Sequence, residues 1–470
     1  MEIPSKLSDL TLEWASSIWK KPFQGFFVHP LSNRDGFCDV ARVSSDSFAW
    51  MVSLVPEDEE LRLTIKKHGL FLKELSFYKV IKPLISKHVS QHLSEGKKWD
   101  LFRIPTYVDG EYDAESGRGF LVLEDFMEKG YKVDDPSLLL LNSSHIFRLI
   151  RQLGTFHGIC SAYYALLPNA DFGEAHLTQE STWFQEDMAP VLKEMYWTCL
   201  SFFQSVPGEE DLCKWFEAKM ANPLEYHRNR STKIKSLVHG DFWHNNIYFN
   251  GDNESLVHDW QMIHWGPATD DLCFLLFSST TACWRRNNWY SAITAYYESF
   301  SSVVKAVGVS FEDINLSFEN FMDDIRASIP LSIFFCGNVR DLQLEEEFPL
   351  ITDDESEFIS MNISSDSSSS STSGEPTSPI VKTNISLSSH SSEEQDDSTK
   401  QQQTQPKLLL LERRGLKKIP TIASHRELCK LEKLKEEGKK IGDITPKEAR
   451  AMRRKLYLDL YREASSTHYI

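Results

Sequence analysis

One short stretch carries three side chains of the types that phosphoryl transfer requires. Residues 237–249 read LVHGDFWHNNIYF, an apolar pair followed by a polar loop and a predicted strand. A turn then leads to a second predicted strand, Leu256–His258, which ends on Asp259. This hairpin would bring Asp241, Asn246 and Asp259 around one small volume. One carboxylate could orient an attacking hydroxyl there, while the amide and the second carboxylate held Mg²⁺ on nucleotide phosphates.

The spacing of these residues resembles a known family signature. His-Gly-Asp, four further residues and Asn246, then Asp-Trp-Gln at 259–261, is similar to the choline kinase and aminoglycoside phosphotransferase group. The chain resembles most closely the CHK kinase-like proteins, which include the ecdysteroid kinases, and residues 265–272 also resemble that family. Over roughly residues 25–340, the resemblance implies an α+β, two-lobed protein kinase-like fold. Its N-terminal lobe would be small and β-rich, and its C-terminal lobe larger and helical.

The resemblance also implies a role for each residue of the motif. Asp241 would be the catalytic carboxylate, and Asn246 and Asp259 would hold Mg²⁺ against ATP. Structural support for the loop would come from three further residues: His239, Gly240 and Asp271. Gly240 would let the backbone turn tightly, and Asp271 would bond to the loop from the start of a helix. Taken alone, Asp241 could instead be a turn or capping aspartate.

Four residues of the N-terminal region are predicted to lie at the nucleotide: Gly36, Glu74, Glu124 and Phe126. Gly36 sits at the tip of a predicted hairpin that would cover the phosphates, although an ordinary β-hairpin reads the same way. Glu124 and Phe126 follow a continuous apolar run, which is typical of a buried strand. The resemblance makes this point the hinge, whose backbone hydrogen-bonds the adenine.

Ser53 departs from the family pattern. When the predicted strand 48–55 is aligned on Pro56, Ser53 occupies the position of the phosphate-binding lysine. Alternation places Met51 and Ser53 on one face of the strand, with Val52 and Leu54 on the other. No basic side chain would therefore reach the phosphates from this strand. Three residues could restore the charge: Arg42, Lys66 and Lys67.

Glu74 lies in a long predicted helical stretch, Leu61–Ile85. The family carries at this position the glutamate that pairs with the missing lysine, and a solvated helix carboxylate is the alternative. Further along, Ile146–Ala165 is predicted to be a helix with one apolar face, on which His157 is expected to be structural. Five tryptophans near the motif could enclose a quaternary ammonium, face a flat lipophilic alcohol, or pack in the core: Trp243, Trp260, Trp265, Trp284 and Trp289.

We expect four regions along the chain. Residues 1–127 would form the nucleotide-binding N-terminal lobe and residues 128–340 the catalytic and substrate lobe. Residues 341–406 are acidic and rich in serine, which predicts a disordered linker. Residues 407–470 are basic, and their two capping-box starts predict a helical tail that could bind a protein partner or form a solvated hairpin.

Composition restricts the function classes. The formal charge of −17 argues against a general nucleic-acid binder and suits a cationic or neutral small substrate, although solubility alone also explains it. Eight cysteines without metal-site spacing are expected to be reduced. Neither a secretory signal nor a membrane span is predicted, so a cytoplasmic location is expected.

Two functions compete. The first is an ATP- and Mg²⁺-dependent phosphotransferase that acts on a hydroxyl of a small molecule, choline-like, sterol-like or similar. The second is a pseudokinase that binds nucleotide weakly or not at all and acts as an interaction protein, which Ser53 favours. The sequence does not identify the acceptor.

Overall fold

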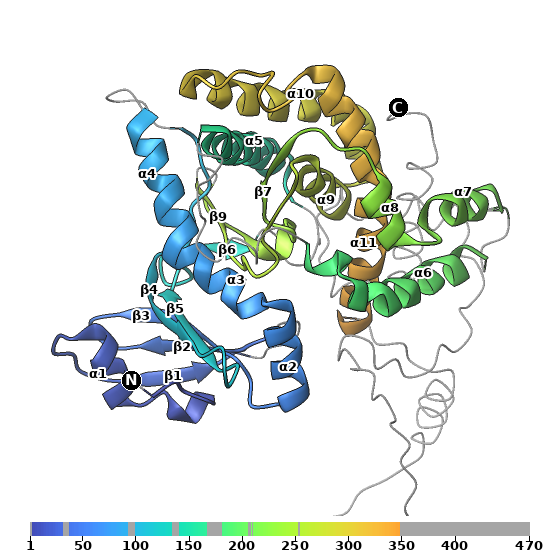
Figure 1. Ribbon diagram of the computed structural model, residues 1–470. Coiled ribbons are helices and arrows are strands. Elements are labelled where there is room, and N and C mark those ends of the chain that lie inside the picture. The colour runs from blue at the N-terminus through green and yellow to red at the C-terminus, as the bar shows by residue number, and fades with distance from the viewer. Residues whose placement is uncertain are drawn as a thin grey trace, which may run out of the picture.

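The computed structural model describes residues 2–347 apart from 32–36, 93–98, 134–140, 167–180, 205–207, 209 and 252–253. Within this part, an antiparallel sheet near the N-terminus is followed by a largely helical region (Figure 1). This is the α+β kinase-like arrangement that the resemblance implied. Gly36 and everything beyond residue 347, including most of the predicted linker and all of the tail, lie outside the described residues.

The sheet has five strands in the order β1-β2-β3-β5-β4, and all neighbouring strands are antiparallel. Its strands are β1 (Phe27–Pro30), β2 (Asp39–Ser44), β3 (Ala49–Leu54), β4 (Tyr107–Tyr112) and β5 (Gly119–Glu124). Burial alternates along β3, so Met51 and Ser53 share one face as predicted. β4 was not predicted, because Asp109 and Gly110 are poor strand formers.

A short helix covers one face of the sheet. α1 (Leu12–Trp19) places Trp14 and Ala15 in a cluster with Trp50 and Val52. The ring of Phe48 stacks on Trp50 with 3.8 Å between centroids. In Figure 1, α1 lies on the side of the sheet away from the helical region. The opposite face, which carries Ser53, therefore turns toward the helices.

The predicted helical stretch 61–85 consists of four pieces: α2 (Glu59–His68), α3 (Leu70–Ser76), a π-helical turn (Phe77–Ile81) and α4 (Lys82–His92). Gly69 separates α2 from α3 because it adopts a left-handed conformation, with φ 64°, that glycine tolerates. Phe71 and Leu75 of α3 pack in the main hydrophobic core. α3 therefore presents Glu74 from a well-packed helix.

The helical region has seven α-helices within the described residues: α5 (Ser143–Leu166), α6 (Ala189–Gln204), α7 (Glu210–Met220), α8 (Pro223–Asn229), α9 (Thr269–Ser279), α10 (Ala282–Val307) and α11 (Phe318–Glu347). α5 confirms the predicted helix 146–165. α11 continues past residue 340, where we placed the start of the linker, because leucine, glutamine and glutamate there are good helix formers. The other region boundaries stay predictions.

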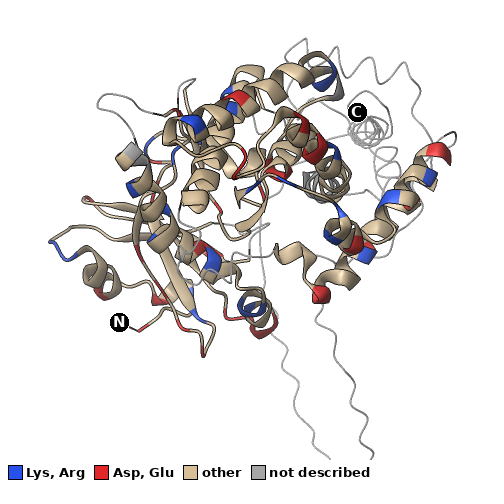
Figure 2. Ribbon diagram, turned by 45° about the horizontal axis from the view of Figure 1, so that its top comes forward, with Lys and Arg blue, Asp and Glu red and all other residues tan. Residues whose placement is uncertain are grey.

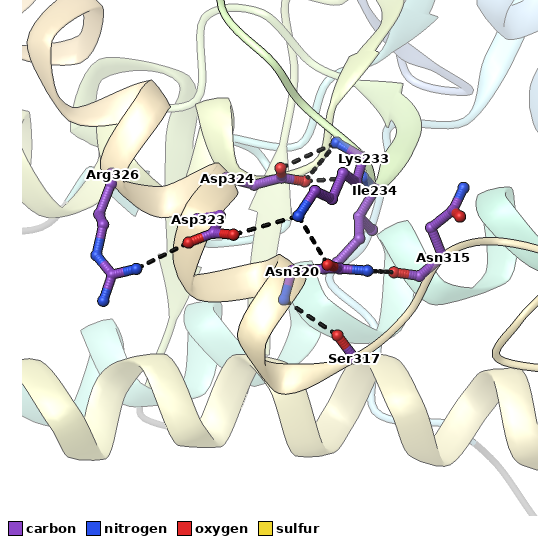
Figure 3. Close-up of polar contacts among 8 residues, drawn as sticks. All are labelled: Lys233, Ile234, Asn315, Ser317, Asn320, Asp323, Asp324 and Arg326. Carbon is purple, nitrogen blue, oxygen red and sulfur yellow. Dashed lines mark hydrogen bonds and ion pairs between the residues drawn. The ribbon is translucent and has the colours of Figure 1, made fainter.

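A polar cluster fixes the start of β7 (Lys235–Val238), the strand that leads into the His-Gly-Asp loop (Figure 3). Asp324 of α11 accepts hydrogen bonds from the backbone N–H groups of Lys233 and Ile234, at 2.9 and 2.7 Å. The Lys233 ammonium donates to the side chains of Asn320 and Asp323. α11 thus holds the entry to the loop from a distant part of the sequence.

No helix in the described ranges is both long enough and apolar enough to cross a membrane. Acidic and basic residues are mixed along the helices (Figure 2). The predicted cytoplasmic location stays a prediction.

Candidate active site

Short strands hold the candidate loop on both sides. β7 pairs with β10 (His264–Pro267), and β8 (Ile247–Asn250) pairs with β9 (Glu254–Val257), which is the predicted hairpin. Between β7 and β8 the chain passes through Gly240, which has φ 81°. A Cβ atom there would collide with the carbonyl oxygen of Met262, so only glycine fits this turn.

Asp241 and Asn246 are in direct contact. The Asn246 side-chain amide donates to the carboxylate of Asp241 at 2.8 Å and to its backbone carbonyl at 2.9 Å. A 3₁₀ turn, His244–Asn246, brings the amide back onto the aspartate. Asn246 is buried, so the pair is held in one arrangement.

Asp259 lies near enough to Asp241 to affect its charge. Burial and then the Asp259 carboxylate raise the pKa of Asp241 to about 7, although the Asn246 amide opposes this. Burial also raises the pKa of Asp259 to about 6. Asp259 has φ 63°, a left-handed conformation that is unusual for a residue other than glycine. Its carboxylate accepts a 3.2 Å hydrogen bond from the Gln261 side chain.

The three side chains suit a hard divalent cation. Two carboxylates and an amide offer the oxygen donors that Mg²⁺ prefers. The raised pKa values of Asp241 and Asp259 mean that the two carboxylates lack compensating charge when they are ionised. A bound cation would supply that charge. In the described residues, no three His, Cys, Asp or Glu side chains cluster as a metal site.

Asp271 fastens the loop from the first turn of α9. Its carboxylate accepts hydrogen bonds from the backbone N–H groups of His239, at 2.6 Å, and Gly240, at 2.9 Å. His157 lies 3.3 Å from the same carboxylate, and its other ring nitrogen is 2.6 Å from the hydroxyl of Tyr296. Burial alone would raise the pKa of Asp271, but these contacts hold it below its ordinary value.

His239 links the two halves of the loop. Its Nδ1 accepts from the backbone N–H of Asp241 at 3.2 Å, and its Nε2 lies 2.9 Å from the carbonyl oxygen of His258. These partners match a neutral ring protonated on Nε2. Burial accordingly lowers the pKa of His239. The ring ties the residue before Asp259 to the backbone of Asp241.

Glu74 reaches the site from α3. Its carboxylate accepts a 3.3 Å hydrogen bond from the backbone N–H of Trp260, the residue after Asp259. Trp260 itself is fully buried and stacks on Phe77, with 3.9 Å between ring centroids. Burial and the nearby Asp259 charge raise the pKa of Glu74 to about 8. Glu74 is therefore a partner of the Asp-Trp-Gln segment rather than a solvated helix carboxylate.

None of the three basic residues suggested as substitutes for the missing lysine is free for that role. Arg42 donates to Asp125 at 2.6 Å and to Glu128 at 2.5 Å. Lys66 donates to the carbonyl oxygen of Glu115 at 2.8 Å. Lys67 pairs with Asp187. The departure at Ser53 is therefore not compensated by any of them.

Comparison with protein families decides the assignment. The model of the ecdysteroid kinase-like family matches residues 39–309. The chain belongs to the ecdysteroid kinase-like family. The comparison with curated proteins returned no match.

Three solved structures of small-molecule kinases resemble this ecdysteroid kinase-like chain at low identity. Amicoumacin kinase hAmiN, in complex with AMP-PNP, Ca²⁺ and Ami, is 14% identical over 75% of this chain and 92% of its own, with a TM-score of 0.36. Spectinomycin phosphotransferase APH(9)-Ia, in complex with ADP and spectinomycin, is 13% identical over 72% and 89%, with 0.37. Choline kinase LicA from Streptococcus pneumoniae is 11% identical over 70% and 89%, with 0.34.

The predicted hinge residues lie at the end of β5. The Glu124 carboxylate pairs with Lys129 at 2.5 Å, and the ring of Phe126 is buried against Tyr248 and His258. The Phe126 carbonyl already accepts from the backbone N–H groups of two later residues, Lys129 and Tyr131. Contact of this segment with a nucleotide stays a prediction.

The sequence analysis did not predict the contacts that several aromatic and histidine side chains make around the candidate loop of this ecdysteroid kinase-like chain. Trp260 is a core residue, one of the alternatives considered for it. The indole N–H of Trp243 lies near the Asp241 carboxylate and lowers its pKa, although its geometry falls short of a hydrogen bond. His157 is structural as expected, but its contact with Asp271 could not be read from its helix alone.

Proposed function

We propose that this ecdysteroid kinase-like protein transfers the terminal phosphoryl group of ATP to a hydroxyl of a small molecule, with Mg²⁺ as the cation. Family membership assigns the chain to the small-molecule phosphotransferases. The observation that carries the proposal is the contact between Asn246 and Asp241 beside the charge of Asp259. This is the donor set that phosphoryl transfer requires.

Asp241 would act on the acceptor. Its carboxylate would accept a hydrogen bond from the attacking hydroxyl, while the Asn246 amide keeps that carboxylate in place. The hydroxyl oxygen forms a bond to the γ-phosphorus as the bond from that phosphorus to the bridging oxygen breaks. ADP leaves, and the hydroxyl proton passes to Asp241. Asp271 and His239 hold the loop so that the carboxylate does not turn away.

Asn246 and Asp259 would hold the cation. When bound, Mg²⁺ would neutralise charge on the nucleotide phosphates and on the phosphoryl group in transfer. Gln261 restrains the Asp259 carboxylate from one side, and Glu74 restrains the backbone that carries it. Each of these contacts would fix a metal ligand before the nucleotide arrives.

Replacing Asp241 by Asn tests the proposal. The change removes the proton acceptor but keeps the size of the side chain, so Mg²⁺-dependent ATP consumption with a panel of small alcohols should fall by roughly 10²–10⁴-fold. Asp313→Asn, a change at an exposed position, is the matched control and should leave the rate unchanged. Equal rates for wild type and Asp241→Asn would contradict the proposal.

A pseudokinase is the second candidate, and one observation favours it. Ser53 replaces the lysine, and Arg42, Lys66 and Lys67 are engaged elsewhere. If this candidate is right, wild-type protein will bind Mg²⁺·AMP-PNP weakly or not at all in calorimetric titration, and no alcohol in the panel will stimulate ATP consumption. A protein partner of the 407–470 tail would then be the first interaction to seek.

A further inference from the structure

Part of the helical region contacts α2 and α3. Two consecutive 3₁₀ turns, Thr182–Phe184 and Glu186–Met188, lead into α6. Three side chains of α2 and α3 bond to these turns and to the residue between them: Lys67 to Asp187, His68 to Gln185 and Lys73 to Thr182. The helix that carries Glu74 is therefore attached to the start of α6 by polar contacts.

Of these three contacts, the one between Lys73 and Thr182 is buried on both sides. The exposed fractions of the two residues are 1% and 4%, and the Lys73 ammonium donates to the Thr182 hydroxyl at 2.9 Å. The partners lie 109 positions apart in the chain. An ammonium inside a protein needs acceptors at fixed places, because moving it away from them leaves a buried charge unsatisfied. Lys73 therefore restricts α3 to one position against the turns.

The turns are themselves fixed to the helices around them. The ring of Phe184 stacks on His227 of α8 with 3.7 Å between centroids. The neighbouring Trp183 packs on Phe335 of α11 with 5.4 Å between centroids. Thr182 is therefore held by the helical region, and Lys73 ties α3 to that region.

The residue after Lys73 contacts a different neighbour of α3. The Glu74 carboxylate accepts its 3.3 Å hydrogen bond from the backbone N–H of Trp260. Trp260 directly follows Asp259, whose φ of 63° is unusual for a residue other than glycine. A backbone in such a conformation persists only when surrounding contacts hold it. Because Lys73 and Glu74 are consecutive in one helix, a shift of Lys73 would move the Glu74 carboxylate with it.

We propose that Lys73 and Thr182 are positioning residues for the cation ligand Asp259. Thr182 fixes Lys73, the helix carries that restraint to Glu74, and Glu74 holds the backbone beside Asp259. This inference rests on the proposed function and deepens it, because it couples the turns before α6 to the cation site. Neither positioning residue touches the cation, and their effect is on how well Asp259 is placed before the cation arrives.

Thr182→Val tests the inference in the full chain, with Mn²⁺ alone as the probe. Mn²⁺ suits the same oxygen donors as Mg²⁺, and its free concentration is read from its electron paramagnetic resonance signal. Valine keeps the size of threonine but removes the hydroxyl, so Asp259 should be less well placed and the Kd for Mn²⁺ should rise about fivefold. Thr182→Ser keeps the hydroxyl and should bind Mn²⁺ like wild type.

Thr64→Val is the matched control. Thr64 is also buried, but its hydroxyl donates to the carbonyl oxygen of Glu60 in its own helix, at 3.0 Å. Loss of this bond should lower the melting temperature without a change in the Kd for Mn²⁺. An equal rise in Kd for Thr64→Val and Thr182→Val would attribute the effect to lost stability and overturn the inference.

A second variant tests the route through Glu74. Glu74→Met removes the acceptor of the Trp260 N–H while keeping a side chain of similar length. If Lys73 and Thr182 act through Glu74, Thr182→Val should raise the Kd no further in the Glu74→Met background. A further rise of about fivefold there would show that Thr182 and Glu74 act independently, which overturns the inference.

Asp259→Asn separates this inference from the proposed function. It should abolish the Mn²⁺ site of the wild-type protein to which the other Kd values refer. If that site is present and Thr182→Val binds Mn²⁺ with the wild-type Kd, the inference is overturned and the proposed function stands. If Asp259→Asn binds Mn²⁺ like wild type, Asp259 is not a cation ligand, which contradicts the proposed function and this inference together.

Discussion

The loop after β7 and helix α3 both contact the residues next to Asp259, yet they differ in how buried charge is compensated. In the loop, Asp271 is surrounded by donors: two backbone N–H groups and the His157 ring. On the other side, Glu74 has one weaker contact, to the Trp260 N–H. We predict that Ser53 stands where the family carries a lysine that would neutralise Glu74. The charge of Asp271 is therefore balanced without a ligand, whereas Glu74 and Asp259, once ionised, would gain a compensating charge from a bound cation.

This difference assigns separate tasks to the two regions. The contacts of the loop hold Asp241 in one geometry, so they serve the stability of the structure. The charge on the α3 side is balanced only when a cation binds at Asp259, so this side determines ligand affinity. Changes in the loop should therefore affect stability and catalysis together, and changes on the α3 side should affect ligand affinity. The following predictions test this division.

The largest effect is expected at Asp271. An asparagine there cannot accept from the loop and His157 together, so a buried charged network is broken. Asp271→Asn should lower the free energy of unfolding by about 3 kcal/mol. Denaturant unfolding measures this, and activity of the folded fraction should fall with it. The exposed Asp313→Asn is the control and should unfold like wild type. A fully stable and active Asp271→Asn protein would break the comparison.

A smaller effect is expected when the missing lysine is restored. Ser53→Lys would place an ammonium near Glu74 and the nucleotide phosphates, so the Kd for Mg²⁺·AMP-PNP should fall about tenfold. Ser53→Met, which adds length without charge, should not change the Kd. If both variants bind alike, the α3 side does not lack charge and the division between the regions fails.

The smallest effect concerns pH. The folded-state pKa values of Glu74, Asp241 and Asp259 are raised to about 8, 7 and 6. Their protonated forms thus stabilise the fold, fully so below the ordinary carboxyl pKa near 4. This stabilisation is lost as the pH rises through the folded values. Melting temperature without metal should therefore fall by roughly 2–4 °C between pH 6 and 8.5.

Mg²⁺ should cancel most of that fall, because it compensates the ionised carboxylates. An Asp241→Asn/Asp259→Asn double variant should show a flatter profile without metal and no rescue by Mg²⁺. A metal-free wild-type profile that rises over the same interval would contradict the raised pKa values.

The central motif could be predicted because its parts are close in sequence. Asp241 and Asn246 are joined by a single turn, and a hairpin returns the chain to Asp259, so local geometry alone brings them together. Gly240 was interpretable for the same reason, since a sharp turn demands its conformation. The apolar periodicity of α5 likewise predicted a helix of nearly the observed length.

Contacts between distant residues could not be predicted. Arg42 forms an ion pair with Asp125, which lies 83 residues later, and nothing in the sequence of its own strand indicates this partner. Such contacts come from packing that only the folded chain establishes.

One crystallographic measurement tests the account most directly. Crystals of the full chain with AMP-PNP and Mn²⁺, with data collected for Mn anomalous scattering, would locate the cation. We predict an anomalous peak about 2.2 Å from side-chain oxygens of both Asn246 and Asp259, with the Asp241 carboxylate facing the γ-phosphate. A nucleotide bound with its Mn²⁺ held by other residues, or with Asp241 turned away from the phosphates, would contradict the account.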